Sequence, residues 1–470
     1  MRIVMKFGGT CIGDGQAVKN VVSLIARYVK SNDIVVVASA INGVTNRLIE
    51  VANRASQRDE KHIAEVTGQL RTRHENTCRQ VVSEGGTLEQ TVGRLDIELG
   101  ELSRALTSIC HLGELTARSH DYVLSFGEKL SNLIVAAALE DSGIRARPLT
   151  GEEAGIVTDS SFGEAAPLMD VTRRQVKERL NPIIKNGTIP VITGYIAATQ
   201  DGVPTTLGRG GSDYTATIVG VSLEADEVWI WTDVDGIMSA DPKIEPSAQT
   251  IREVSFMEAL EMSHFGAKSM HPKALEPAAE VGLPVRVKNA FNPSGPDTLI
   301  LGEQQMKSRN IVKAITSVRD ASMITVSGAG MHGAPGTAAK VLDVLGQNGI
   351  NILMISQSSS EANISLIVAR LNLETAVTAL RRSLLGGSLF REITSETDVS
   401  VVAAVGAGMK GTPGIAARLF KAVAEKDVNV RMITQGSSEL NISFVVREDD
   451  LLKSVRALHE EFKLDGKAIR

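Results

Sequence analysis

Cysteine, aromatic residues and long apolar runs are all scarce in this sequence of 470 residues. Its three cysteines, Cys11, Cys78 and Cys110, are too few and too scattered for a disulfide framework or a zinc site. A reducing compartment, the cytoplasm, is therefore the expected location. No apolar run reaches about 18 residues, so we expect no membrane-spanning helix. The N-terminus also lacks the long apolar core of a signal peptide.

The chain also has no excess of positive charge. The formal net charge is −5 and aromatic residues make up 3%, so neither nucleic acid nor a membrane is an expected partner. Hydrophobic residues make up 43% and charged residues 22%, which is typical of a globular protein with a full core. The length favours about three domains.

Several familiar motifs do not occur. There is no Walker-type GxxxxGK[ST], no protein-kinase signature, and no GxGxxG after the first strand. No Ser-His-Asp pattern is indicated. His264 and His271 have no convincing fellow ligands, so we interpret them as structural and predict no protein metal site.

Two glycine-rich turns stand out instead. The stretch Thr205–Asp213, TTLGRGGSD, has Gly208, Gly210 and Gly211 around Arg209 and runs into an apolar helix. Glycines before a helix present backbone N–H groups to an anion, and an arginine suits a carboxylate or phosphate. We expect Ser212 and Asp213 to cap this helix. Asp213 needs a cationic partner, a lysine or a metal.

The second glycine turn opens the chain. A short strand at residues 2–6 runs into Gly8, Gly9 and Thr10, a helix follows from about Gly15, and residues 33–40 read as a buried strand. Alternating strands and helices predict an α/β fold with a mostly parallel sheet. Ligands gather at the carboxyl ends of such strands. Lys6, Ser39 and Thr45, and later Thr232 and Asp233, should meet there.

Two charged residues have competing interpretations. Glu128 follows Gly127 and is expected at the head of an apolar helix, where the helix dipole alone explains an acid. The functional alternative is recognition of an ammonium group. Lys268 is expected at a helix start, where a lysine is disfavoured, so a purely solvated role is a poor explanation. Residues 57–112 are charged and predict a helical excursion that breaks at Gly85 and Gly86.

The last third is an internal repeat. GAGMHGAPGTAAKVL at Gly328 recurs as GAGMKGTPGIAARLF at Gly406, and 406 − 328 is 78. Each copy predicts strand, helix, strand, strand, helix, as in a small four-stranded sheet with two helices. Residues 390–396 would close the first sheet and residues 311–318 the second, so we expect the copies to be interleaved.

The combination of glycine turns, Lys6, Lys268, Arg209 and acids indicates phosphoryl transfer, which depends on positioned amides and cations. Six motifs in order then resemble the aspartate kinases of the amino-acid kinase superfamily. They are KFGGT, VVVASA with GVTN, SFGE, TTLGRGGSDYTA, WTDVDGI with ADP, and FGAK with HP. The repeats are similar to the paired effector-binding ACT domains of that family.

The resemblance implies an architecture and a reaction. The fold would be a three-layer αβα amino-acid kinase domain at 1–302, followed by two ferredoxin-like βαββαβ ACT domains at 319–396 and 397–470. The strand at 311–318 would join the second ACT domain. The reaction would be phosphorylation of the β-carboxylate of L-aspartate by ATP, with Mg²⁺ carried mainly by ATP. We expect no fused homoserine dehydrogenase domain.

The resemblance also implies residue roles. Lys6 and Lys268 would neutralise the γ-phosphoryl group and Asp213 would position them, as the catalytic set. The ATP site would comprise Lys6, Gly8, Gly9, Thr10, Thr232, Asp233, Met238, Lys243 and Lys268. Aspartate would be held by Ser39, Thr45, Glu128, Arg209, Gly210 and Gly211. An effector, threonine or lysine, would be held by Gln357, Ser358, Asn363, Gln435, Gly436 and Asn441.

Some positions depart from the family pattern, and two other functions remain open. Met238 replaces a usual tyrosine and Lys243 a usual arginine, which puts nucleotide affinity in question. Cys11, Ile41 and Tyr195 are milder changes. The alternatives are a kinase for another acidic amino acid and a catalytically silent amino-acid sensor. The ACT repeats are also expected to build a homodimer or homotetramer through their open sheet edges.

Overall fold

The computed structural model describes residues 1–265, 270–302 and 311–466. These residues form two compact units. The first comprises Met1–Ile237, Arg252–Phe256 and Ser269–Met306, and the second comprises Met238–Ile251, Met257–Lys268 and Lys307–Arg470. Two segments before residue 302 thus group with the second unit. The domain bounds expected from the sequence stay predictions.

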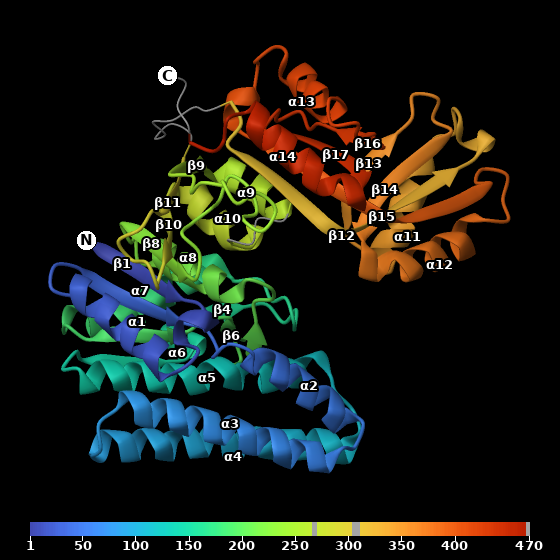
Figure 1. Cartoon of the computed structure of the whole chain (residues 1–470). Coiled ribbons are helices and arrows are strands. Elements are labelled where there is room, and N and C mark those ends of the chain that lie inside the picture. The colour runs from blue at the N-terminus through green and yellow to red at the C-terminus, as the bar shows by residue number, and fades with distance from the viewer. Residues whose placement is uncertain (266–269, 303–310, 467–470) are drawn as a thin grey trace. The chain divides into compact units, whose positions relative to one another are not determined.

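The first unit is built on an eight-stranded sheet, which is parallel except where β10 pairs with β11. The mostly parallel α/β sheet is confirmed, and Figure 1 shows its strands between helices. In sheet order, the strands are β3 (Ala146–Leu149), β5 (Ile189–Thr193), β2 (Asp33–Ala38), β1 (Arg2–Phe7), β8 (Glu227–Thr232), β10 (Val285–Asn289), β11 (Thr298–Leu301) and β9 (Glu253–Ser255).

Helices cover both faces of this sheet. One face packs against α1 (Gly15–Tyr28) and α5 (Ala117–Asp141), and the other against α7 (Met169–Lys185) and α8 (Gly211–Ser222), which α10 (Pro272–Val281) adjoins. Side chains alternate between the faces along a strand. Met5 of β1 therefore joins the α1 and α5 core, while Lys6 points to the α8 face.

A helical layer extends beyond α5, as the sequence predicts. It consists of α2 (Val44–Ser56), α3 (Glu60–Val81) and α4 (Gly86–Leu112), with the break between α3 and α4 at the glycine pair. Figure 1 shows α3 and α4 side by side below α5. Among the described residues, α5 is the one helix long and apolar enough to cross a membrane, but 89% of its apolar window is buried inside the structure. It is the core helix of this unit.

A small three-stranded sheet lies beside the main one. It contains β4 (Val157–Thr158), β6 (Ile196–Thr199) and β7 (Pro204–Thr206), and β6 and β7 form a hairpin with Asp201-Gly202 in its turn. The short helix α6 (Gly151–Ala154) precedes β4. The hairpin delivers the chain directly to the Arg209 turn, so its register decides where that turn lies.

The second unit contains the two repeats and α9 (Phe256–His264) from Met257 onward, and its strands form one six-stranded sheet. In sheet order these are β13 (Ile352–Gln357), β14 (Asn363–Ala369), β12 (Ala314–Ser327), β15 (Glu392–Val405), β17 (Asn441–Arg447) and β16 (Met432–Thr434). Its helices are α11 (Thr337–Gln347) and α12 (Leu373–Leu384) in the first repeat, and α13 (Ile415–Ala424) and α14 (Leu451–Glu461) in the second.

The two repeats share their longest strands. Residues 314–318 of β12 pair with residues 401–405 of β15, and residues 323–327 of β12 pair with residues 392–396 of β15. Each repeat therefore has a four-stranded antiparallel sheet. Residues 392–396 are the fourth strand of the first repeat, and residues 314–318 are the fourth strand of the second repeat. The sequence suggests separate closing strands, but in the structure each one continues without a break into the neighbouring repeat.

Candidate active site

The carboxyl ends of β1, β2 and β8 meet at one edge of the first sheet. The backbone N–H of Gly8 donates to the carbonyl of Trp231 (3.2 Å), and the N–H of Ser39 donates to the carbonyl of Phe7 (3.2 Å). These bonds extend the strand pairing by one residue beyond β1 and β2. The turns that follow the three strands are thereby held next to one another.

Gly9 sits where no side chain fits. A Cβ at this position would lie 2.8 Å from the carbonyl oxygen of Ala40, which is shorter than real Cβ contacts. The backbone N–H of Asn42 donates to the carbonyl of Gly9 (3.2 Å). Glycine is therefore needed for the turn after β1 to rest against the loop after β2.

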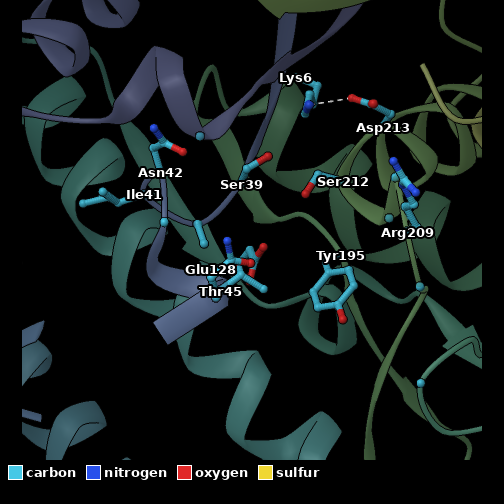
Figure 2. Close-up of a pocket in the computed structure, with 18 of the residues that line it drawn as sticks. Lys6, Ser39, Ile41, Asn42, Thr45, Glu128, Tyr195, Arg209, Ser212 and Asp213 are labelled. Carbon is cyan, nitrogen blue, oxygen red and sulfur yellow. Dashed lines mark ion pairs between the residues drawn. The ribbon is translucent and has the colours of Figure 1, made fainter. Parts of the chain in front are cut away.

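Lys6 and Asp213 form an ion pair across this edge. The Lys6 Nζ lies 2.5 Å from Asp213 Oδ1, and their side chains are 11% and 13% exposed. Figure 2 shows the pair at the rim of a pocket. The sequence leaves open a lysine or a metal as the partner of Asp213, and the structure supplies the lysine. Among the described residues, no group of three or more His, Cys, Asp or Glu side chains could hold a metal ion.

The Arg209 turn begins α8 in a way that the sequence predicts only in part. Gly208 and Gly210 have φ values of 75° and 74°, which favour glycine. Gly210 is the N-cap and makes no side-chain cap bond. The expectation that Ser212 and Asp213 cap the helix is therefore wrong: both lie in its first turn. Because the cap is a glycine, the Asp213 carboxylate is left for Lys6.

Glu128 is the second correction. Helix α5 begins at Ala117, so Glu128 lies near its middle and the helix dipole does not explain it. Its side chain is buried, and its Oε2 has no hydrogen-bond partner among the described residues. Burial raises the pKa of this carboxyl to about 8, although the Ala40 N–H and the charge of Lys6 act in the opposite direction. A buried, unsatisfied carboxylate that lines a pocket is suited to a cationic ligand.

The pocket brings Glu128 and Arg209 together with the lysine–aspartate pair. Figure 2 shows Ser39 and Ser212 between Lys6 and Glu128, with Arg209 to one side. Arg209 is exposed, and no carboxylate of the described chain lies within ion-pair distance of it. The lining residues are Lys6, Gly9, Ser39, Ala40, Ile41, Asn42, Gly43, Thr45, Asn46, Glu128, Gly163, Glu164, Tyr195, Gly208, Arg209, Gly210, Gly211, Ser212 and Asp213.

Of two supporting residues, Asp121 escapes the sequence-based search and Tyr195 is noted there only as a departure from the family pattern. Asp121 is fully buried and accepts three hydrogen bonds, from the N–H of Gly163 (2.9 Å), the N–H of Thr206 (2.9 Å) and the Thr206 hydroxyl (2.8 Å). It ties β7 to the loop that carries the pocket residue Gly163. Tyr195, a pocket residue, has φ of 65°, and burial raises its pKa to about 12. An acid inside an apolar helix could have drawn attention to Asp121.

The expected nucleotide residues are only partly brought to this edge. Thr232 ends β8 and donates to Asp233 Oδ1 (3.1 Å), and neither residue lines the pocket. Met238 and Lys243 belong to the second unit, and their nucleotide roles stay predictions. Lys268 lies outside the described residues. His271 is the N-cap of α10, consistent with a structural role, and its Cβ lies where a Cβ on Gly210 would collide.

The expected effector positions lie at corresponding places in the repeats. Gln357 ends β13, and the N–H of Ser358 donates to the carbonyl of Asn363 (3.2 Å) at the start of β14. Gln435 and Gly436 form the matching turn before Asn441, which begins β17. The structure therefore groups the predicted residues within each repeat, and their ligand role stays a prediction.

Comparison with known proteins agrees with this geometry. The sequence model of the amino acid kinase family matches residues 1–289, and that of the ACT domain matches residues 324–384 and 402–462. The chain is 33% identical over 98% of its length to the bifunctional aspartokinase/homoserine dehydrogenase 1, chloroplastic, of Arabidopsis thaliana, of which it covers 51%. It is 32% identical over 98% of its length to aspartokinase 1, chloroplastic, of the same plant, and covers 80% of it.

A solved structure extends the similarity to the whole chain. The E. coli aspartokinase III structure in complex with aspartate and ADP superposes with a TM-score of 0.81 at 26% identity, covering 98% of this chain and 99% of that one. The chain spans about half the length of the bifunctional curated relatives it matches. The matched family models and relatives show that the chain belongs to the amino acid kinase family and that, like the aspartokinases it is similar to, it carries two C-terminal ACT domains.

Proposed function

We propose that this chain transfers the γ-phosphoryl group of ATP to the β-carboxylate of L-aspartate, forming 4-phospho-L-aspartate and ADP. The observation that carries the proposal is the pocket in which buried, unsatisfied Glu128 and exposed Arg209 accompany the Lys6–Asp213 pair. A free amino acid has an ammonium group and an α-carboxylate. Glu128 supplies the charge for the first and Arg209 the planar donor set for the second.

In this reaction a β-carboxylate oxygen of aspartate forms a bond to the γ-phosphorus while the bond from that phosphorus to the ADP oxygen breaks. Lys6, held by Asp213, places a positive charge where negative charge spreads over the transferring group. The N–H of Gly8 is bonded to the carbonyl of Trp231, so the N–H groups that this turn would offer to the phosphates are those of Gly9 and Thr10. Within the first unit, Thr232 and Asp233 complete the proposed nucleotide site. The nucleotide roles of Met238, Lys243 and Lys268 stay predictions of the family resemblance.

Mg²⁺ accompanies ATP in this proposal as part of the substrate. The described residues offer no protein cage for it, since no cluster of three candidate ligands occurs among them. Lone carboxylates such as Asp233 can still contact an ion that the phosphates hold. The three cysteines are free and buried, in keeping with a reducing location such as the cytoplasm.

The repeats fit feedback regulation and assembly. Aspartate phosphorylation leads to the end products lysine, threonine and methionine. Threonine or lysine would bind the ACT domains and inhibit the kinase reaction. The strands β13 and β16 end the six-stranded sheet, and free edges of this kind can pair between chains, as in a homodimer or homotetramer. Size-exclusion chromatography with light scattering tests the assembly directly.

The experiment for the activity traps the product. Purified protein, Mg-ATP and hydroxylamine are incubated with L-aspartate or, in parallel, L-glutamate, and both ADP and hydroxamate are measured. Aspartyl hydroxamate with no glutamyl product supports the proposal. Equal use of glutamate would favour a kinase for another acidic amino acid. If neither amino acid yields ADP or hydroxamate and an effector still binds, a catalytically silent sensor is favoured. The intact Lys6–Asp213 pair argues against that alternative.

A further inference from the structure

Two carboxylates of α9 are bound by the second repeat. Glu258 Oε2 accepts from the Lys313 ammonium group (2.8 Å), and Glu258 Oε1 accepts from the backbone N–H of Ala407 (2.7 Å). One helical turn later, Glu261 accepts from the side-chain amide of Asn441. The Lys313 and Glu258 side chains are 2% and 0% exposed. A cation, a backbone N–H and a side-chain amide of the repeat thus bind two carboxylates of the same chain.

The first repeat carries the same three groups. The repeat offset of 78 relates Lys313 to Arg391, Ala407 to Ala329, and Asn441 to Asn363, since 391 − 313, 407 − 329 and 441 − 363 are all 78. Arg391 keeps the positive charge and adds a planar set of N–H donors. The asparagine is unchanged, and the backbone N–H is retained because position 329 is not proline.

The backbone frame around these groups is the same in both repeats. The N–H of Lys313 donates to the carbonyl of Val405 (2.8 Å), and the N–H of Arg391 donates to the equivalent carbonyl, that of Ser327 (2.8 Å). The glycines before the two alanines are also equally crowded. A Cβ on Gly406 would lie 2.4 Å from the carbonyl oxygen of Ile311, and a Cβ on Gly328 would lie 2.2 Å from that of Leu389. The backbones of Arg391 and Ala329 are therefore placed as those of Lys313 and Ala407 are.

What differs is the occupant. Within residues 1–265, 270–302 and 311–466, no acidic side chain contacts the guanidinium of Arg391, the N–H of Ala329 or the side chain of Asn363. Arg391 and Ala329 are exposed, whereas Lys313 is buried and Ala407 is half-buried. The first repeat thus presents a carboxylate-binding frame that the described chain leaves open.

We propose that Arg391 and the backbone N–H of Ala329 bind the carboxylate of a small-molecule effector, a free amino acid, and that Asn363 contacts its next polar group. The proposal rests on the feedback regulation proposed above and deepens it. The second repeat takes no effector at its matching site, because Glu258 and Glu261 occupy it. One ligand should bind per chain.

Titration calorimetry on the full chain tests this proposal, with L-threonine and L-lysine as probes. The Arg391→Gln variant removes the charge, and Arg382→Gln, an exposed arginine on α12 of the same repeat, is the matched control. We expect the dissociation constant of the bound amino acid to rise at least tenfold in Arg391→Gln and to stay within twofold of wild type in Arg382→Gln. The decarboxylated analogues cadaverine and 1-amino-2-propanol should not compete.

Three results would overturn the proposal: unchanged binding by Arg391→Gln, equal binding of the decarboxylated analogues, or no binding of any of the twenty amino acids. A stoichiometry of two per chain would contradict the occupied second repeat. The hydroxamate assay separates this proposal from the proposed activity, because Arg391→Gln should phosphorylate aspartate at the wild-type rate without effector. Binding through Arg391 in a protein that forms no hydroxamate would overturn the activity alone.

Discussion

Ala321 and Val399 face each other across β12 and β15, and they are also the same position in the two repeats, because 399 − 321 is 78. The register of the two long strands shifts on both sides of this pair. Arg370 and Glu448 show the same relationship: they are 78 residues apart and form an ion pair of 2.6 Å. Both pairs lie where a local two-fold axis relates one repeat to the other.

The first prediction concerns Lys6. Lys6→Ala should lower turnover by about 10²–10³-fold, because one donor of positive charge to the transferring phosphoryl group is lost. Aspartate should still bind through Glu128 and Arg209. Steady-state kinetics and aspartate titration check this, with exposed Lys19→Ala of α1 as the control. Near-normal turnover in Lys6→Ala would contradict the phosphate role.

Aspartate binding should depend on pH through Glu128. Its pKa is raised to about 8 by burial, and only the ionised form pairs with an ammonium group. The dissociation constant for aspartate should therefore fall as pH rises from 6.5 and level off above about 8. Binding at pH 7 should release a proton, measurable by calorimetry in buffers of different ionisation enthalpy. Glu128→Gln should weaken binding at pH 8.5 by about ten- to a hundredfold and abolish the pH dependence.

The same group should affect stability in the opposite direction. Since the folded-state pKa of Glu128 is raised from 4.5 to about 8, its contribution is fully present below pH 4.5 and is lost as pH rises through 8. Glu128→Gln cannot ionise. The free energy of unfolding of Glu128→Gln, relative to that of wild type, should therefore increase between pH 5 and pH 9 by on the order of 4 kcal/mol. Denaturant unfolding at both pH values measures this, and an equal difference at both would contradict the buried carboxyl.

Gly210 and Gly282 form a matched pair for backbone strain. Both have positive φ, 74° and 70°, but a Cβ on Gly210 would lie 2.3 Å from the Cβ of His271, whereas a Cβ on Gly282 would meet nothing within 4 Å. Gly282→Ala should cost about 1 kcal/mol of unfolding free energy, and Gly210→Ala clearly more. Gly210→Ala should also impair aspartate binding. Equal losses of unfolding free energy in the two variants would show that His271 moves aside without destabilising the protein.

The ion pair between Glu258 and Lys313 should matter more than a surface pair. Glu258→Ala leaves the Lys313 ammonium group buried and should destabilise the protein by about 3–5 kcal/mol. Glu461→Ala, which removes the half-buried partner of the exposed Arg418, should cost about 1 kcal/mol or less. The double variant Glu258→Met with Lys313→Met should recover much of the loss. Thermal unfolding compares all three, and a double variant as unstable as Glu258→Ala would contradict the account.

Local patterns were enough to predict the α/β sheet, its ligand edge and the repeat. The apolar strand before Gly8, the buried strand at residues 33–38 and the glycines around Arg209 are short-range signals that tertiary packing leaves intact. They place Lys6 and Arg209 at one edge with no knowledge of the fold.

The sequence misplaces Glu128 because Gly127 resembles a helix boundary. The helix starts at Ala117, where Thr116 accepts a bond from the N–H of Ser119, and Gly127 lies inside it. A Cβ on Gly127 would come within 3.0 Å of the Cβ of Ala40, so this glycine serves close packing and not helix termination. That contact joins residues 87 positions apart, since 127 − 40 is 87, and no local pattern contains it.

The strands that the two repeats share bear on how the chain acquires its structure during synthesis. The first repeat cannot complete its sheet until residues 392–396 have been made, and the second needs residues 314–318, which emerge long before its own first strand. Residues 314–318 must therefore wait for β15, and both repeats close in one event when that strand arrives. A destabilising change in either repeat should accordingly appear as one unfolding transition for the pair, and truncation within β15 should leave neither repeat folded.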